Sequence, residues 1–300
     1  MKAKRSRPFK VSKALYPFKD HWFERDGVAM HYVDEGPKNA STPPVVLLHG
    51  NPTWSFLYRD IIKRLAKTHR CLAPDYPGFG FSDHPKGYGY TPQEHAEWVA
   101  AWLEELQVKD FILVVQDWGG PIGLKVATDN PDAVAGLVIL NTWAWPPNLF
   151  MRTFSYVVGG PLGKYLHLQR NFFADKIVKS GMYRKHEKSE EVFRAYTDPF
   201  PTPAKRMGTY VFPRAIRQCD KWLKGIEDNL FTLVGKPKEM VWAMQDMAFG
   251  RESIIDRFGS HFPGTPLIRL EKASHYLQED DPEAIADSIE RVSKQLTSPH

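Results

Sequence analysis

The stretch Val115-Gln116-Asp117-Trp118-Gly119-Gly120 decides the fold class of this chain. It follows the apolar run Phe111-Ile112-Leu113-Val114 directly and precedes the helix-like run Pro121-Ile122-Gly123-Leu124. A continuous apolar run is typical of a strand that is buried on both faces, so Asp117 is expected in a sharp turn between a strand and a helix. Taken alone, the stretch fits a nucleophile turn and a helix-capping aspartate equally well.

Short apolar runs recur on both sides of this stretch, at residues 45–48, 137–140, 240–244 and 267–270. Helical patterns lie between them. The clearest begins at Thr91, with Pro92 at the first helical position and Glu94 completing a capping box. Strands that alternate with helices predict an α/β fold with a doubly wound, mostly parallel sheet.

The alternation breaks between residues 145 and 226, which are rich in aromatic residues and prolines and contain no convincing strand run. We interpret this stretch as an inserted helical cap. Residues 20–144 and 227–300 then form the core domain, and residues 1–19 form a solvated basic tail. A cap inserted there lies above the carboxyl ends of the strands, where open α/β sheets bind ligands.

Three further polar positions follow strand runs. Asn51 lies in His49-Gly50-Asn51-Pro52, Asp246 follows the run at 240–244, and His275 follows the run at 267–270. Each alone is explained as a turn or a helix cap. Together, the order Asp117, Asp246, His275 is the nucleophile, acid, histidine order of α/β-hydrolases. The sequence therefore predicts an α/β-hydrolase with a carboxylate nucleophile in place of serine.

An aspartate nucleophile suits displacement at a saturated carbon. Asp117 is ionised at neutral pH, and a helix N-terminus favours that charge. Attack forms an alkyl ester on the enzyme. His275 then acts as general base for a water molecule, the co-substrate, and Asp246 orients the imidazole. The backbone N–H groups of Asn51 and Trp118 are expected to hold the oxyanion.

The leaving group depends on the donors beside the nucleophile. A halide needs donors that do not transfer a proton, and the indole N–H of Trp118 and the carboxamide of Asn51 are such donors. An epoxide instead needs an acid that protonates the ring oxygen.

The sequence resembles the haloalkane dehalogenases. The similar blocks are residues 49–55, 74–80, 116–121 and 273–275, and the similarity runs from about residue 20 to residue 290, weakest in the cap. The resemblance implies that Asp117 is the nucleophile, His275 the base, and Asn51 and Trp118 the halide-binding pair. It also implies haloalkanes as substrates and a halide ion as product.

That family places its acid after the sixth or the seventh strand. This chain has Asn141 at the first position, which cannot serve, and Asp246 at the second. It thus resembles the branch with an Asp-His-Asp triad. Phe172, Phe173 and Pro213 of the cap either line the pocket or form the cap's own core.

Two alternative functions remain. An epoxide hydrolase shares the fold and the triad, and the cap offers tyrosines that such an enzyme needs: Tyr156, Tyr165, Tyr183, Tyr196 and Tyr210. The polar Asn51 favours the dehalogenase, because epoxide hydrolases usually have an apolar aromatic residue in that loop. The other alternative is a non-catalytic ligand receptor on the same fold. The presence of all three triad residues argues against it.

The net charge of +5 arises at the N-terminus, since residues 1–19 hold seven basic residues and no acidic one. The remaining 33 basic and 35 acidic residues nearly balance, so a nucleic-acid partner is not expected. No segment is apolar enough to span a membrane, and no membrane partner is expected.

Only two cysteines occur, Cys71 and Cys219, which form no disulfide framework and fit a reducing compartment. The basic N-terminus lacks the apolar region of a secretory signal, so a cytoplasmic protein is expected. No His/Cys cluster has zinc spacing, so no metal and no cofactor are predicted. The sequence predicts no oligomeric state.

Overall fold

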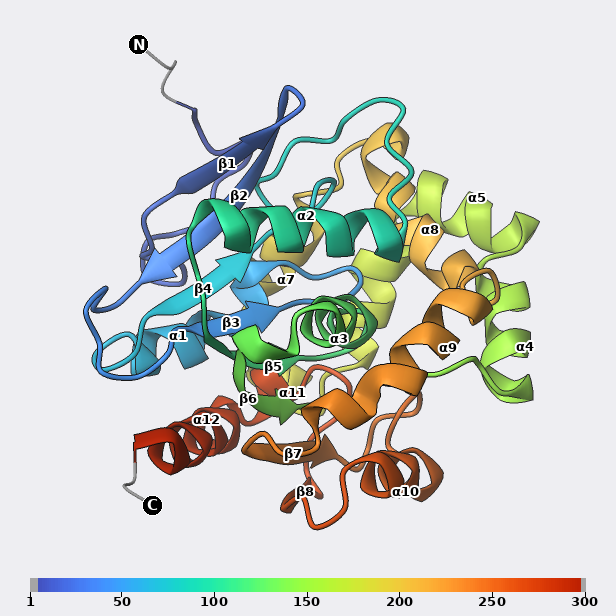
Figure 1. Cartoon of the computed structure of the whole chain (residues 1–300). Helices are drawn as coiled ribbons and strands as arrows, with labels where there is room; N and C mark the ends of the chain where they lie inside the picture. The colour runs from blue at the N-terminus through green and yellow to red at the C-terminus, as the bar shows by residue number, and fades with distance from the viewer. Residues whose placement is uncertain (1–4, 298–300) are drawn as a thin grey trace.

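An eight-stranded sheet forms the centre of the computed structural model, which describes residues 5–297 (Figure 1). The strand order is β1-β2-β4-β3-β5-β6-β7-β8. The β1–β2 and β2–β4 pairs are antiparallel and the others are parallel, which confirms the predicted mostly parallel sheet. The strands are β1 (His21–Arg25), β2 (Val28–Glu35), β3 (Val45–Leu48), β4 (Cys71–Pro74), β5 (Phe111–Val115), β6 (Val134–Ile139), β7 (Lys238–Ala243) and β8 (Leu267–Leu270).

The central strands are apolar throughout because both faces of the sheet are covered. In β3, Val46 and Leu48 join one buried cluster, and Val45 and Leu47 join the other. Helices α2 (Pro92–Glu105), α3 (Gly119–Asp129) and α10 (Glu252–His261) contribute to the first cluster, and α1 (Arg59–Leu65) and α12 (Pro282–Thr297) to the second. Alternate side chains therefore bury apolar surface on opposite faces.

All five predicted strand runs correspond to strands of the structure. The runs at 45–48, 111–115 and 267–270 are strands β3, β5 and β8, and the runs at 137–140 and 240–244 overlap β6 and β7. Helix α2 has the predicted capping box, in which the Glu94 N–H donates to Thr91 Oγ1 at 3.2 Å and the Thr91 N–H donates to Glu94 Oε2 at 3.0 Å. The sequence did not predict β1, β2 or β4.

The chain between β6 and β7 is helical, and residues 145–226 contain no strand. Helices α4, α5 and α8 contact one another and lie together on one side of the molecule, while α9 packs against α3 (Figure 1). The helices are α4 (Leu149–Val158), α5 (Pro161–Arg170), α6 (Val178–Ser180), α7 (Glu190–Thr197), α8 (Met207–Ala215) and α9 (Asp220–Asn229). Within residues 5–297, no helix combines the length and the apolar character that a membrane crossing requires.

The N-terminal segment is not the solvated tail that its charge suggested, as far as residues 5–19 are concerned; residues 1–4 lie outside the described part. Tyr16 is fully buried and Phe18 nearly so. The Arg7 guanidinium donates to the Asp20 carboxylate at 2.9 Å and to the Phe18 carbonyl at 2.8 Å. Burial of aromatic side chains outweighs the basic character of the segment and attaches it to the core.

Candidate active site

Asp117 occupies the turn between β5 and α3 with a positive φ of 49°. This left-handed conformation is strained for a residue with a Cβ and is typical of a nucleophile turn. The two following glycines make the turn possible. A Cβ at Gly119 would lie 2.2 Å from the Leu48 carbonyl oxygen, and one at Gly120 would lie 1.8 Å from Thr142 Oγ1. Any larger residue would push the helix away from the sheet.

The three residues predicted as a triad meet at the carboxyl ends of the strands. His275 Nδ1 lies 3.0 Å from Asp246 Oδ2, and His275 Nε2 lies 3.8 Å from Asp117 Oδ2. Asp246 also accepts the backbone N–H groups of Ala248 at 2.8 Å and Phe249 at 3.2 Å with its other oxygen. That second set of bonds fixes the carboxylate so that it faces the imidazole.

The loop after β3 contacts the other oxygen of the nucleophile. The Asn51 backbone N–H donates to Asp117 Oδ1 at 2.7 Å, and the Trp118 backbone N–H interacts with the same carboxylate. Gly50 allows the approach, because a Cβ there would lie 2.3 Å from Asp117 Oδ1. The carboxylate thus interacts with two backbone N–H donors, of which Asn51 binds Oδ1, while Oδ2 faces His275.

The charges at the site are strongly coupled. Burial raises the pKa of Asp117, and the charge of His275 and the N–H groups of Asn51 and Trp118 oppose that rise. The helix terminus was expected to favour the ionised carboxylate; here desolvation outweighs it. Burial alone lowers the pKa of His275, but the charge of Asp246, its hydrogen bond and the charge of Asp117 together raise it to about 9.

The side chains of the two predicted halide donors, Asn51 and Trp118, are both buried. The Trp118 ring packs on Trp143 at 4.7 Å and on Phe212 at 5.2 Å between centroids. Asn51 Nδ2 donates to the Thr209 carbonyl of the cap at 3.2 Å, which leaves its second amide hydrogen available.

Asn141, the residue at the alternative acid position, has a structural role. The Asn141 side chain donates to the Ala243 carbonyl at 3.0 Å and accepts the Ala243 N–H at 2.7 Å. Its own carbonyl accepts the Asp117 N–H at 2.9 Å. The Asn141 side chain therefore joins the ends of β6 and β7 and supports the turns that carry both Asp117 and Asp246.

The sequence did not single out Gln116. Its amide nitrogen lies 3.0 Å from the His275 carbonyl oxygen and 3.3 Å from His275 Nε2. The side chain of Gln116 is fully buried, and its Oε1 has no hydrogen-bond partner. Its position directly before the nucleophile is visible in the sequence, but its contact with a residue far along the chain is not.

The three cap residues predicted as pocket lining have other contacts. Phe173 is buried and stacks on His167 at 4.8 Å, Phe172 is half-buried, and the Pro213 carbonyl accepts the Ser155 hydroxyl at 2.5 Å. A pocket role for these residues stays a prediction. Their neighbour Phe212 is the α8 side chain that packs on Trp118; no sequence pattern distinguished it.

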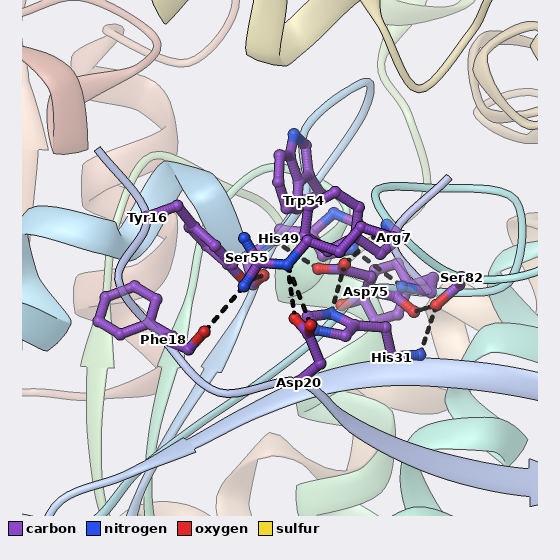
Figure 2. A network of polar contacts seen from close by, with 12 residues as sticks. Arg7, Tyr16, Phe18, Asp20, His31, His49, Trp54, Ser55, Asp75 and Ser82 are labelled. Atoms are coloured by element: carbon purple, nitrogen blue, oxygen red, sulfur yellow. Dashed lines mark hydrogen bonds and ion pairs between the residues drawn. The ribbon is translucent and has the colours of Figure 1, made fainter. Parts of the chain in front are cut away.

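A buried polar network supports the loop that carries Asn51 (Figure 2). Asp75 accepts the Ser55 N–H at 2.9 Å and lies 2.8 Å from His31 Nδ1, while His31 Nε2 lies 3.2 Å from Asp20. Burial alone lowers the pKa of His31, but Asp75 and Asp20 raise it overall. Two carboxylates around one imidazole favour the imidazolium, which donates to both.

Among residues 5–297, no group of three or more His, Cys, Asp or Glu is arranged to hold a metal ion. The structure contains a carboxylate at a strained turn, two backbone N–H donors that interact with it, and a histidine–aspartate pair beside its Oδ2.

Comparison with known proteins agrees with this geometry. Residues 43–282 match the family model of the alpha/beta hydrolase fold. The chain is 41% identical over 283 residues to haloalkane dehalogenase 2 of Mycobacterium tuberculosis, covering 94% of this chain and 97% of the relative. It is 32% identical to cis-3-alkyl-4-alkyloxetan-2-one decarboxylase of Shewanella oneidensis, covering 92% and 88%. The crystal structure of haloalkane dehalogenase DbeA from Bradyrhizobium elkani matches with a TM-score of 0.84 and 28% identity, covering 93% and 98%.

Proposed function

The chain belongs to the haloalkane dehalogenase family of α/β-hydrolases, and we propose that it hydrolyses haloalkanes to an alcohol and a halide ion. One observation carries the proposal: a carboxylate, Asp117, occupies the nucleophile turn, with the Asn51 N–H on one oxygen and His275 beside the other. In serine enzymes of this fold, the hydroxyl of the nucleophilic serine attacks an acyl carbon and becomes acylated. A carboxylate at the same point is suited to attack on a saturated carbon.

In the first step, Asp117 Oδ2 attacks the carbon that bears the halogen. A carbon–oxygen bond forms, the carbon–halogen bond breaks, and the halide leaves with the bonding electron pair. The indole N–H of Trp118 and the free amide hydrogen of Asn51 stabilise the departing anion. No proton moves in this step, so neither His275 nor Asp246 is required for it.

In the second step, His275 removes a proton from water, and the hydroxide oxygen attacks the carbonyl carbon of the Asp117 ester. The N–H groups of Asn51 and Trp118 stabilise the oxyanion on Oδ1. Collapse of this intermediate expels the alcohol, which takes up the proton from His275, and leaves Asp117 as a carboxylic acid. Release of the second proton of the water molecule to solvent then restores the Asp117 carboxylate. Asp246 holds the imidazole with Nε2 toward the ester and stabilises the imidazolium.

The first test is halide release from a panel of bromo- and iodoalkanes, with Asp117→Ala as the control. Release that disappears in the control supports the proposal. The same assay includes two rival substrate classes, an epoxide panel and a cis-3,4-dialkyl-oxetan-2-one, because one relative is an oxetanone decarboxylase. Turnover of a rival class without any halide release would contradict the dehalogenase assignment.

The mechanism has its own test. In His275→Ala, Asp117 should still be alkylated, but the ester should persist because no base activates water. Mass spectrometry of the variant after incubation with an active substrate should therefore find the alkyl group on Asp117. An unmodified Asp117 would contradict covalent catalysis.

A further inference from the structure

Asp280, the last residue of α11 (Leu277–Asp280), is a buried carboxylate that the proposed mechanism does not use. Its Oδ2 accepts the backbone N–H of Ser274 at 2.8 Å and that of Tyr183 at 3.0 Å, and its Oδ1 accepts the N–H of Arg184 at 2.8 Å. Ser274 directly precedes His275. Tyr183 and Arg184 belong to the cap. One carboxylate therefore joins the loop that carries the catalytic base to the cap.

The same two segments meet at a second point. The Tyr276 N–H donates to the Gly181 carbonyl at 3.0 Å, and a Cβ at Gly181 would lie 2.7 Å from the Tyr276 ring. From the core side, the Gln116 amide donates to the His275 carbonyl at 3.0 Å. The backbone of the histidine loop, residues 274–276, is thus held at each of its three residues. The Tyr276 contact reaches the cap directly, and the Ser274 contact reaches it through Asp280.

Glu279 strengthens this connection. Its carboxylate forms a buried ion pair with Arg59 of the core and accepts the Tyr196 hydroxyl of the cap at 2.5 Å; Lys188 of the cap lies 3.2 Å away. Burial alone raises the pKa of Glu279, but the charge of Arg59 and its hydrogen bonds lower it to about 2. This residue holds cap and core together without touching the histidine loop through its side chain.

We propose that Asp280 is a positioning residue for the hydrolysis step, an inference that rests on the proposed function. Three backbone N–H groups need acceptors in one buried place, and a carboxylate with two charged oxygens satisfies all of them. Loss of Oδ2 as an acceptor releases Ser274 and Tyr183, and loss of Oδ1 releases Arg184. Either change loosens the connection between the histidine loop and the cap, so the loop shifts relative to the ester. Alkylation of Asp117 does not use His275, so this shift slows only the second step.

The test compares Asp280→Asn with Asp281→Asn. Asp281 is a matched control, because its carboxylate also accepts a backbone N–H, that of Ala284 at 3.1 Å, but at the start of α12. Rapid-quench mass spectrometry with a reactive bromoalkane measures formation and decay of the alkyl-enzyme separately. In Asp280→Asn we expect ester decay to slow by about 10–100-fold, the scale of a small misplacement of a catalytic group. Alkylation should stay at the wild-type rate.

The ratio of the two rates distinguishes a positioning role of Asp280 from a purely structural one. Alkyl-enzyme that accumulates in Asp280→Asn and not in Asp281→Asn supports the inference. Equal loss of both steps, or no change in either, overturns it, because a purely structural residue lowers the active fraction without altering the ratio of the two rates. His275→Ala is included as a reference: if it fails to accumulate ester, the proposed function itself is overturned.

Discussion

Asp246 performs two tasks with its two oxygens. One accepts the N–H groups that close the turn after β7, and the other faces His275. The turn-capping interpretation and the catalytic one therefore describe the same side chain. Asp117 does not cap the helix that follows it: Trp118 is the N-cap residue of α3, and the Asp117 carboxylate accepts the N–H of Asn51. Because strand ends converge at one edge of a parallel sheet, these positions could be predicted from the sequence.

The side chains that complete the site could not be predicted in the same way. Gln116, Trp143 and Phe212 touch His275 or Trp118 only because distant elements fold together. Aromatic residues are abundant in this chain, so composition alone does not distinguish a ring beside the nucleophile from one in the cap.

The coupling between Asp117 and His275 predicts a pH effect. The Asp117 charge contributes to the raised pKa of His275, about 9, in the free enzyme. Alkylation turns that carboxylate into a neutral ester, so the pKa of His275 should fall in the alkyl-enzyme. His275 is a base only when neutral. The rate of ester hydrolysis should therefore rise with pH and level off above this lowered pKa.

The measurement is single-turnover ester hydrolysis as a function of pH, compared with an NMR titration of His275 in the free enzyme. The kinetic pKa should be the lower of the two. Equal values would mean that the Asp117 charge does not influence His275.

The proposed halide pair, Asn51 and Trp118, predicts the effect of Asn51→Ala. This change removes a donor to the departing anion and should cost about 1–3 kcal/mol of stabilisation, the scale of a hydrogen bond to a charged group. The rate of alkylation and the affinity for bromide, measured by tryptophan fluorescence, should fall together. The contact from Asn51 to the Thr209 carbonyl is lost too, so thermal unfolding is recorded in parallel. A weakened fold with unchanged bromide affinity would remove Asn51 from the halide site.

At the scale of the element, burial does not separate the predicted strands from the missed ones: β4, which was missed, is fully buried, and β8, which was predicted, is partly exposed. β3 and β5 are apolar runs between helices. β2 contains His31 and Asp34, and β4 is a four-residue strand that ends in a proline. β2 is a strand because it pairs in antiparallel fashion with β1 and β4. Such pairing is a tertiary contact, and the periodicity of apolar residues in the sequence does not reveal it.

Helix α2 begins with a capping box, which gives a prediction at the scale of the element. Thr91→Ala removes the hydroxyl that accepts the Glu94 N–H and should destabilise the protein by about 1 kcal/mol. Thr91→Ser keeps the acceptor and is the matched control. Chemical denaturation of both variants provides the comparison. If Ala and Ser lower the midpoint equally, the hydroxyl is not what stabilises this helix terminus.

At the scale of the whole molecule, the N-terminal segment is part of the fold. Arg7 pairs with Asp20, Asp20 lies beside His31, and His31 lies beside Asp75, which holds Ser55 in the loop after Asn51 (Figure 2). The prediction of a tail rested on the basic residues of this segment. It did not consider the few aromatic residues among them. Burial of Tyr16 and Phe18 decides the position of the segment.

Substitution of Tyr16 tests whether the N-terminal segment is part of the core. Its ring is fully buried against Trp54 and Phe18, and its hydroxyl lies 2.5 Å from Ser55 Oγ. Tyr16→Ala should lower the free energy of unfolding by about 3–5 kcal/mol, as for other large aromatic side chains in a core. Tyr16→Phe keeps the ring and loses only the hydroxyl contact, at a cost of about 1 kcal/mol. If Tyr16→Ala unfolds at the wild-type denaturant concentration, the segment is a surface tail after all.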